Sequence, residues 1–365
     1  MTPRTGGTEV TGWTALRGIA ALWVVLFHYR DRFTPRLDSQ IFTSGYLGVE
    51  LFFVLSGSVL YYVYRTEFTS GRFDYSDFLI KRLARLYPVH LVTMVAAAAI
   101  IFGLPIVGFR EPPPYGLGEA LAVDGLMLQS FPIIGRLSLN YPSWSISAEF
   151  LAYLIFPLCL AVVLRTTLIR AALLAIILFF VCEVLATRVT GSAFDLNLAL
   201  TRLTYNYSVL RVVPEFFLGV LMAAATLRYQ AKLAPYATPV MIVSTIGLVA
   251  SAMIGNDLLF ILCVGPLVSS LLLFQGRFPA PLVWLGRISY SLYMSHVVVK
   301  MVLMGTMERV GGYSDGNMPV ALMPLAVGIA IGCAAVLYYV VEKPGQRETL
   351  RRLRLLRADP VRVRR

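Results

Sequence analysis

Charged residues are scarce in this sequence. They make up 14% of its 365 residues, whereas hydrophobic residues make up 58%, and the mean hydropathy is +0.72. An ordinary soluble domain has roughly a quarter of its residues charged, and one as apolar as this chain would expose large apolar patches to water. The composition therefore excludes an ordinary soluble protein and favours one that is surrounded by a lipid bilayer.

Cysteine is also rare. Four cysteines occur, and each lies inside an apolar stretch without the short spacing of metal ligands: Cys159, Cys182, Cys263 and Cys333. A disulfide framework is therefore not expected, and we predict no metal site. No internal repeat is visible, and no polar segment is long enough to form a soluble catalytic domain. Any chemistry must lie within the apolar part of the chain.

Acidic residues are outnumbered by basic ones, 20 to 32, which gives a net charge of +12. Such an excess can indicate nucleic-acid binding, but here the basic residues stand beside apolar runs rather than on a separate polar domain. We interpret them as a signal of membrane topology and expect no nucleic-acid partner. The densest cluster predicts a basic cytoplasmic tail over residues 345–365 that contacts membrane lipids.

Long apolar runs are what the sequence has in abundance. A helix needs about 20 apolar residues to cross a bilayer, and four runs free of charged residues are near or beyond this length: 86–109, 233–256, 258–275 and 317–341. Six more contain a single charged residue each: 12–29, 41–64, 137–164, 171–187, 212–227 and 288–307. We therefore predict an all-α, polytopic integral membrane protein with about ten transmembrane helices, in a domain that spans residues 1–344.

The flanks of these runs predict how the chain is oriented. With the N-terminus inside, most Lys and Arg residues fall on the inner side, so both termini are predicted to be cytoplasmic, in a multi-pass protein of the cytoplasmic (inner) membrane. The segment 111–136 opens with three prolines, and its apolar stretch is too short to span. We expect a re-entrant or interfacial element there, on the outer side.

The first predicted span carries two polar residues of functional interest, Arg17 and His28. They are 11 positions apart, and at about 100° and 1.5 Å per residue both project from one face of a helix, about 16 Å apart. A titratable group inside a span is a functional candidate by default. The alternative is that Arg17 anchors the helix at the inner interface and His28 lies at the outer one.

A basic group follows the second predicted span. It contains Lys81, Arg82 and Arg85, and on a helix the two arginines share a face, where planar guanidinium groups could bind a polyphosphate together. The same three residues would also serve positive-inside topology. From the spacing alone both interpretations stay open.

Two further spans contain polar side chains. Glu149 could orient or charge-balance a histidine, although Ser145 and Ser147 before it also fit a helix cap. His296 lies in the middle of the ninth predicted span, where a helix-packing role is more typical than catalysis. The role of Glu50 is left open, and His90, beside the basic group, is expected to lie at the membrane interface.

Six segments in this order resemble the acyltransferase 3 family of bacterial membrane acyltransferases, which O-acylate exported acceptors. The segments are Leu16-Arg-Gly-Ile-Ala-Ala-Leu-Trp-Val-Val-Leu-Phe-His28, Gly45-Tyr-Leu-Gly-Val-Glu-Leu-Phe-Phe-Val-Leu-Ser-Gly57, Arg82 and Arg85 with Tyr87-Pro88, Trp144-Ser-Ile-Ser-Ala-Glu149, Leu285-Gly-Arg-Ile-Ser-Tyr-Ser-Leu-Tyr293 with His296, and Val341-Glu-Lys-Pro344. The resemblance runs from residue 16 to about 344 and implies a stand-alone membrane domain. At Glu50 the family often has Asp.

The resemblance implies that His28 is the essential histidine, with Arg17 its partner along the helix, and that the arginine pair serves an acyl-CoA donor. We therefore expect Lys81, Arg82 and Arg85 to bind acyl-CoA, with acetyl-CoA favoured. We expect His28, Arg17 and Glu149 to be catalytic, with His28 the general base that activates a hydroxyl of an extracytoplasmic glycan or a lipid-linked sugar. An acyl-histidine relay is the alternative chemistry.

A secondary transporter is the competing function. In that case His28, Glu149 and Lys300 would form a proton or substrate pathway, since membrane-embedded charges also suit transport. Against it, the two halves of the chain show no repeat, and a histidine combined with a basic loop suits a phosphorylated cytoplasmic donor better.

Overall fold

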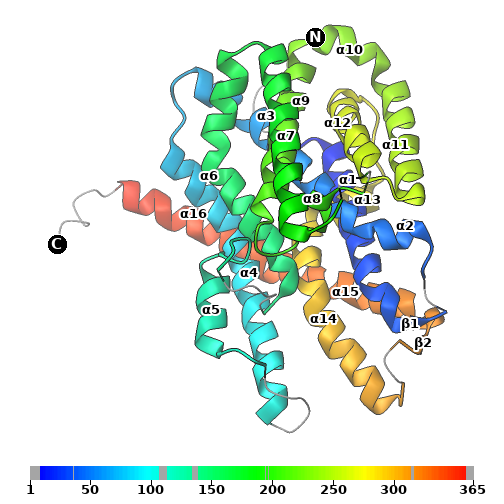
Figure 1. Ribbon diagram of the computed structural model, residues 1–365. Coiled ribbons are helices and arrows are strands. Elements are labelled where there is room, and N and C mark those ends of the chain that lie inside the picture. Colours follow the sequence, from blue (N-terminus) through cyan, green and yellow to red (C-terminus); the bar gives the residue numbers. More distant parts are fainter. Residues whose placement is uncertain are drawn as a thin grey trace.

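The computed structural model describes residues 9–35, 37–106, 113–133, 139–193, 195, 197–313 and 316–358, and these are almost entirely helical. The helices in chain order are α1 (Thr11–Tyr29), α2 (Gln40–Thr43), α3 (Gly48–Thr69), α4 (Tyr75–Ile106), α5 (Leu117–Gly125), α6 (Trp144–Arg165), α7 (Leu168–Thr190), α8 (Ala199–Arg202), α9 (Val209–Arg228), α10 (Gln230–Leu233), α11 (Ala237–Ile254), α12 (Asp257–Leu273), α13 (Ala280–Arg287), α14 (Ser289–Val310), α15 (Met323–Leu337) and α16 (Lys343–Ala358). Two-residue strands β1 (Phe33–Thr34) and β2 (Met318–Pro319) pair in parallel. Figure 1 shows this helical arrangement.

The structure confirms an all-α protein with several helices apolar enough to cross a membrane. Seven helical stretches among the described residues are long and apolar enough, and the bent pair α13 and α14, which meet at 67°, makes an eighth. The helix α12 is shorter, with 17 residues, and α1 has 19. Each of the ten predicted spans coincides with a helix, but length and composition support seven or eight crossings.

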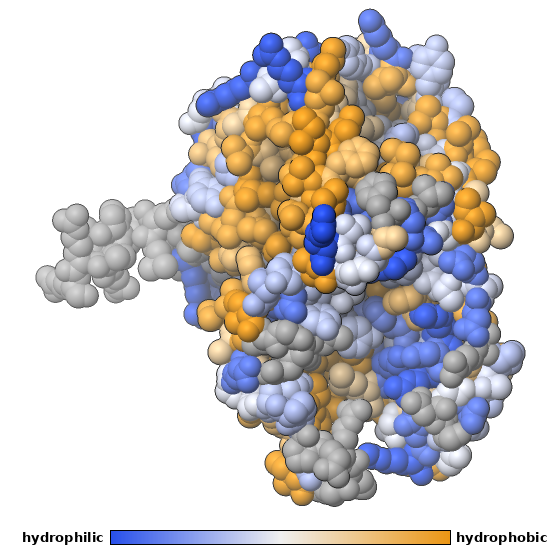
Figure 2. All heavy atoms as spheres, in the orientation of Figure 1, coloured by the Kyte–Doolittle hydropathy of each residue, from blue (hydrophilic) through white to orange (hydrophobic). Residues whose placement is uncertain are grey.

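Apolar side chains on the outside agree with a lipid environment. Helix α7 exposes Leu173, Ile177 and Phe180, each more than half accessible, and α11 exposes Val243 and Ile246 in the same way. In Figure 2 apolar residues gather into a broad area over α6 and α7 on the face in view. In water such an area would be costly, whereas acyl chains accept it.

Close helix packing in the interior depends on glycine. Helices α3 and α9 are in extensive contact. A Cβ atom on Gly57 of α3 would collide with the backbone oxygen of Phe216, and one on Gly219 of α9 would collide with that of Val54. Small residues allow membrane helices to approach until their backbones are in contact. The two glycines therefore fix the relative position of α3 and α9, and both helices contribute residues to the walls of the candidate site described below.

Two further predictions can be compared with the chain's course. In the predicted non-spanning segment 111–136, the described residues form the nine-residue helix α5 and the turns after it, too short to cross a bilayer. The predicted boundary at residue 344 falls inside a continuous helical stretch, because α15 passes through a single π-helical turn, Tyr338–Glu342, into α16.

Candidate active site

Four of the predicted site residues line one cavity, which encloses about 740 Å³ of empty space, part of it open to solvent. Arg17 comes from α1, Arg82 and Arg85 from α4, and Glu149 from α6. Residues from α3 and α14 complete the wall. The sequence placed these four side chains on three separate helices, and the fold brings them around one space. We call it the basic cavity.

The guanidinium of Arg17 has no hydrogen-bond partner among the described side chains and backbone groups. It therefore offers its five N–H donors to the basic cavity. Arg82 is held loosely, since its Nη2 lies 3.3 Å from the hydroxyl oxygen of Tyr64 and its guanidinium lies over the Tyr64 and Phe78 rings. Both arginines can reorient toward a bound anion.

Arg85 is fixed more firmly than the other two arginines. Its Nη1 lies 3.3 Å from Oε1 of Glu342, and Ser291 donates a hydrogen bond of 2.6 Å to the other oxygen of that carboxylate. Glu342 is buried and belongs to the Val-Glu-Lys-Pro segment near the C-terminus. This ion pair joins the end of the chain to α4 and keeps Arg85 at the cavity.

Lys81 is separated from its two basic neighbours. Its Nζ forms an ion pair of 2.6 Å with Asp77, one turn earlier on α4, and it does not line the basic cavity. The structure therefore places the two arginines, and not the lysine, where they could act together.

Glu149 also differs from its expected surroundings. Its Oε1 accepts hydrogen bonds from Ser56, at 2.7 Å, and Tyr153, at 2.6 Å. The group hydrogen-bonded to His28 is the ring of His296 and not the carboxylate of Glu149. Glu149 instead places a negative charge in the wall of the basic cavity.

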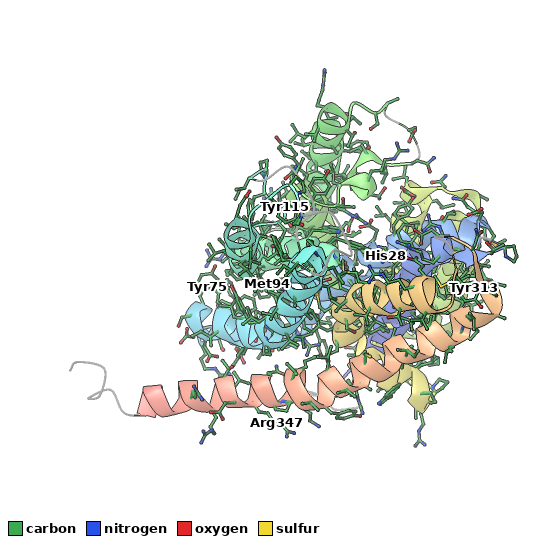
Figure 3. All side chains as sticks on the ribbon, turned by 90° about the horizontal axis from the view of Figure 1, so that it is seen from below. His28, Tyr75, Met94, Tyr115, Tyr313 and Arg347 are labelled. Atoms are coloured by element: carbon green, nitrogen blue, oxygen red, sulfur yellow. The ribbon has the colours of Figure 1, made fainter. Side chains whose placement is uncertain are left out.

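His28 lies in the last turn of α1, is half-buried, and is labelled in Figure 3. Its Nδ1 is 2.8 Å from Nε2 of His296, and the two rings are stacked at a centroid distance of 4.9 Å. The Tyr141 ring meets it edge-on at 5.2 Å. Lys300 donates to the backbone oxygen of His28 and lies 3.0 Å from Asp31.

A second cavity, of about 750 Å³, contains His28. We call it the histidine cavity. Aromatic side chains form much of its wall, with Thr201, Thr204, Arg202 and Arg211 among its polar residues, and Val49 and Tyr293 belong to the walls of both cavities. Arg17 and His28 thus lie on one helix, as predicted, but face different cavities that share a wall. The Tyr293 hydroxyl is held there by Ser145, at 2.8 Å.

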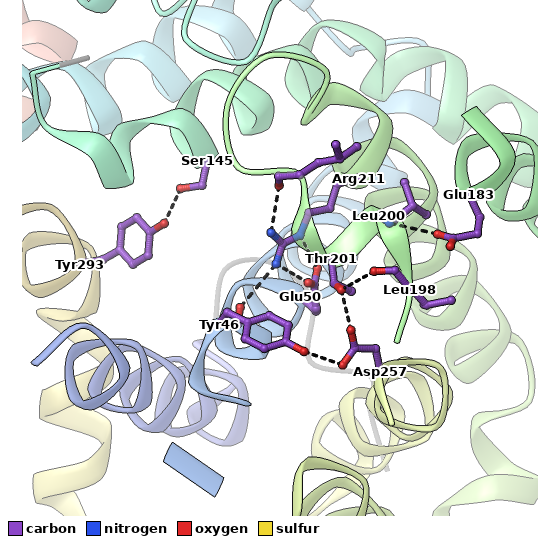
Figure 4. A network of polar contacts seen from close by, with 11 residues as sticks. Tyr46, Glu50, Ser145, Glu183, Leu198, Leu200, Thr201, Arg211, Asp257 and Tyr293 are labelled. Atoms are coloured by element: carbon purple, nitrogen blue, oxygen red, sulfur yellow. Dashed lines mark hydrogen bonds and ion pairs between the residues drawn. The ribbon is translucent and has the colours of Figure 1, made fainter. Parts of the chain in front are cut away.

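A buried charge network supports the histidine cavity (Figure 4). Arg211 forms an ion pair with Glu50, and it also donates to the backbone oxygens of Leu203, at 3.1 Å, and Tyr46, at 3.4 Å. The Tyr46 hydroxyl in turn donates to Asp257, at 2.8 Å. The sequence left the role of Glu50 open and did not single out Arg211; a carboxylate in mid-span was the signal that a cation should face it.

Comparison with known proteins decides the family. Residues 10–339 match the family model described as an acyltransferase domain, Acyl_transf_3. This chain belongs to the acyltransferase 3 family. The match includes every residue that lines the two cavities, so the candidate site lies within the family's domain.

Three relatives show how the family relation extends along the chain. An acyltransferase of Streptomyces mycarofaciens, MdmB, is 29% identical over 95% of this chain and 94% of its own. Protein 2 in the picA locus of Rhizobium radiobacter is 35% identical over 37% of this chain and 73% of its own. A Staphylococcus aureus protein, named provisionally as an O-acetyltransferase, is 23% identical over 94% of this chain and 58% of its own. No solved structure matches the chain.

Proposed function

We propose that this acyltransferase moves an acyl group, acetyl in the favoured case, from cytoplasmic acyl-CoA to a hydroxyl of an extracytoplasmic or lipid-linked glycan. The observation that carries the proposal is the pair of adjoining cavities. One is lined by three arginines, the other by His28, and they share Val49 and Tyr293. A charged donor and a hydroxyl acceptor could thus be bound on either side of one wall.

The basic cavity suits the donor. CoA carries several phosphate groups, and planar guanidinium groups bind phosphate through paired, charge-assisted hydrogen bonds. Arg17 and Arg82 are free to turn toward such a ligand, and Arg85 contributes its charge from a fixed position. On the predicted topology this cavity faces the cytoplasm, which holds acyl-CoA.

The histidine cavity suits the acceptor. Its walls combine the aromatic rings of Phe27, Tyr46 and Trp144 with polar groups such as Thr201 and Arg202. Ligand sites of this type pair apolar surface with a few polar groups that fix orientation, a combination that fits a ring with several hydroxyls.

In the proposed reaction His28 acts as general base. It takes the proton from the acceptor hydroxyl while that oxygen bonds to the thioester carbonyl carbon. The carbon–sulfur bond then breaks, and the imidazolium returns the proton to the leaving thiolate, which gives CoA and the O-acyl product. In the alternative chemistry, the imidazole nitrogen attacks the thioester first and an acyl-histidine forms.

The transporter hypothesis has less support. Its three residues are engaged separately: Glu149 with Ser56 and Tyr153, His28 with His296, and Lys300 with Asp31. The family is one of acyltransferases, and no observation on the described residues favours transport over transfer.

Donor binding can be tested by calorimetric titration of acetyl-CoA into the protein in nanodiscs. A hydrogen bond to a charged group contributes about 1.5–3 kcal/mol, so Arg17→Gln should weaken binding about 10-fold to 150-fold. Lys81→Gln is the matched control and should bind like the wild type, because Lys81 lies outside the cavity. An unaltered protein that binds no acetyl-CoA would refute the acyl-CoA proposal.

The role of His28 needs a separate measurement. His28→Ala should abolish transfer of labelled acetyl groups to cell-surface glycans, yet bind acetyl-CoA normally, since His28 does not line the basic cavity. Retained transfer would remove His28 from the chemistry.

A further inference from the structure

We propose that His296 is a positioning residue that fixes the proton of His28 on Nδ1 and leaves the lone pair of Nε2 free for catalysis. The proposal rests on the proposed function of His28 and goes beyond it, since it states which nitrogen acts and which residue determines this. From the sequence His296 was expected to have a packing role.

The argument starts from the nitrogen of His296 that faces away from His28. This Nδ1 lies 2.6 Å from the backbone oxygen of Tyr293, one turn earlier on α14. A carbonyl oxygen accepts hydrogen bonds and never donates. The Nδ1 atom must therefore carry a hydrogen.

The second step follows from the chemistry of a neutral imidazole, in which one nitrogen donates and the other accepts. With its hydrogen on Nδ1, neutral His296 has a lone pair on Nε2. That atom is 2.8 Å from Nδ1 of His28, so His28 must be the donor. Its own hydrogen is then on Nδ1, and its Nε2 holds the lone pair.

The surroundings of the two rings support the neutral state. Among the described residues, no carboxylate is hydrogen-bonded to either ring, and the nearby cation, Lys300, is engaged by the His28 backbone oxygen and Asp31. The hydroxyls of Tyr29 and Tyr293 are directed to backbone or serine oxygens instead. What remains is a chain of two hydrogen bonds, in which His28 donates to His296 and His296 donates to the Tyr293 backbone oxygen.

The position of His296 is set by the fold. It is fully buried, and the Tyr29 hydroxyl donates to its backbone oxygen at 2.8 Å, which joins the end of α1 to α14. In metal and hydrolase sites, the tautomer and orientation of a functional histidine are commonly fixed by a residue that hydrogen-bonds to its other ring nitrogen. Here a second histidine, rather than a carboxylate, performs this task.

Two substitutions distinguish positioning from packing. In His296→Gln, the side-chain oxygen can accept from Nδ1 of His28, whereas in His296→Met the side chain offers only a thioether sulfur, which is a weak acceptor. The rate of acetyl-CoA hydrolysis, with water as the acceptor, can be measured in nanodiscs from the release of the CoA thiol. This assay does not require the natural glycan. We expect kcat of the methionine variant to fall about 10-fold or more, with KM for acetyl-CoA unchanged.

The glutamine variant should recover most of this loss, and His90→Gln serves as the matched control. His90 is a buried histidine on α4 that bonds the Asp124 backbone oxygen and lines neither cavity, so kcat should be unchanged. Acetyl-CoA affinity reports whether each variant is folded, because His296 does not line the basic cavity.

The outcomes separate the two proposals. Equal losses in the glutamine and methionine variants, or wild-type kcat in the methionine variant while His28→Ala is inactive, would overturn the positioning role and leave the proposed function intact. Full activity in His28→Ala would instead refute the role of His28, and the inference with it.

Discussion

Replacement of Glu50 by glutamine should lower the free energy of unfolding by about 3 kcal/mol. Glu50 and Arg211 are 0% and 1% accessible, and removal of one partner from a buried ion pair typically costs about 3–5 kcal/mol, because the other charge stays buried without compensation. Two backbone oxygens still accept from Arg211, and Glu215 lies next to the pair. These contacts place the expected loss at the lower end of the range.

Unfolding by a denaturing detergent in mixed micelles measures this loss. The double substitution Glu50→Leu with Arg211→Leu should be more stable than Glu50→Leu alone, since it removes both charges. A loss of under about 1 kcal/mol for Glu50→Gln, or a double variant less stable than the single one, would refute the claim that Glu50 compensates the buried charge of Arg211.

Three further predictions concern other parts of the fold. Glu183→Ala should destabilise the protein by about 2–4 kcal/mol in the same unfolding assay, because the Glu183 carboxylate accepts hydrogen bonds from the first two amides of α8, at 2.8 and 3.0 Å. An unchanged midpoint of unfolding would contradict this. Gly57→Val should prevent close packing of α3 and α9 and reduce the yield of monodisperse protein. Gly103→Val should not reduce the yield, because a Cβ atom at Gly103 has no neighbour within 4 Å. Similar yields for the two variants would count against the glycine contact. Val49→Phe should slow acetyl transfer by roughly 100-fold through misplacement at the shared wall, and normal transfer would argue against a reaction at this wall.

Helices and their apolar faces could be predicted from the sequence because the length of an apolar run and the bilayer thickness are directly related. The number of crossings was less certain, since run length does not show a bend such as that between α13 and α14, or the short length of α12. The family could be predicted from six ordered segments, and the comparisons confirm it.

The site could be predicted only in part. Arg17, Arg82, Arg85 and Glu149 were all selected, yet that they share a cavity depends on how α1, α4 and α6 pack. The contact of His28 with His296 joins positions 268 apart, for which no local pattern exists. In the sequence Lys81 looks equivalent to Arg82 and Arg85, but its ion pair with Asp77 on the same helix holds its ammonium group away from the basic cavity.

The shared wall between the two cavities has a kinetic consequence. If the proposed donor and acceptor bind in separate spaces that meet at Val49 and Tyr293, neither substrate blocks the entry of the other. A ternary complex can therefore form in either order, and the acyl group crosses the wall while CoA stays where it entered. Under the proposed function, the acyl group would pass from donor to acceptor at this wall without an alternating-access movement of the helices.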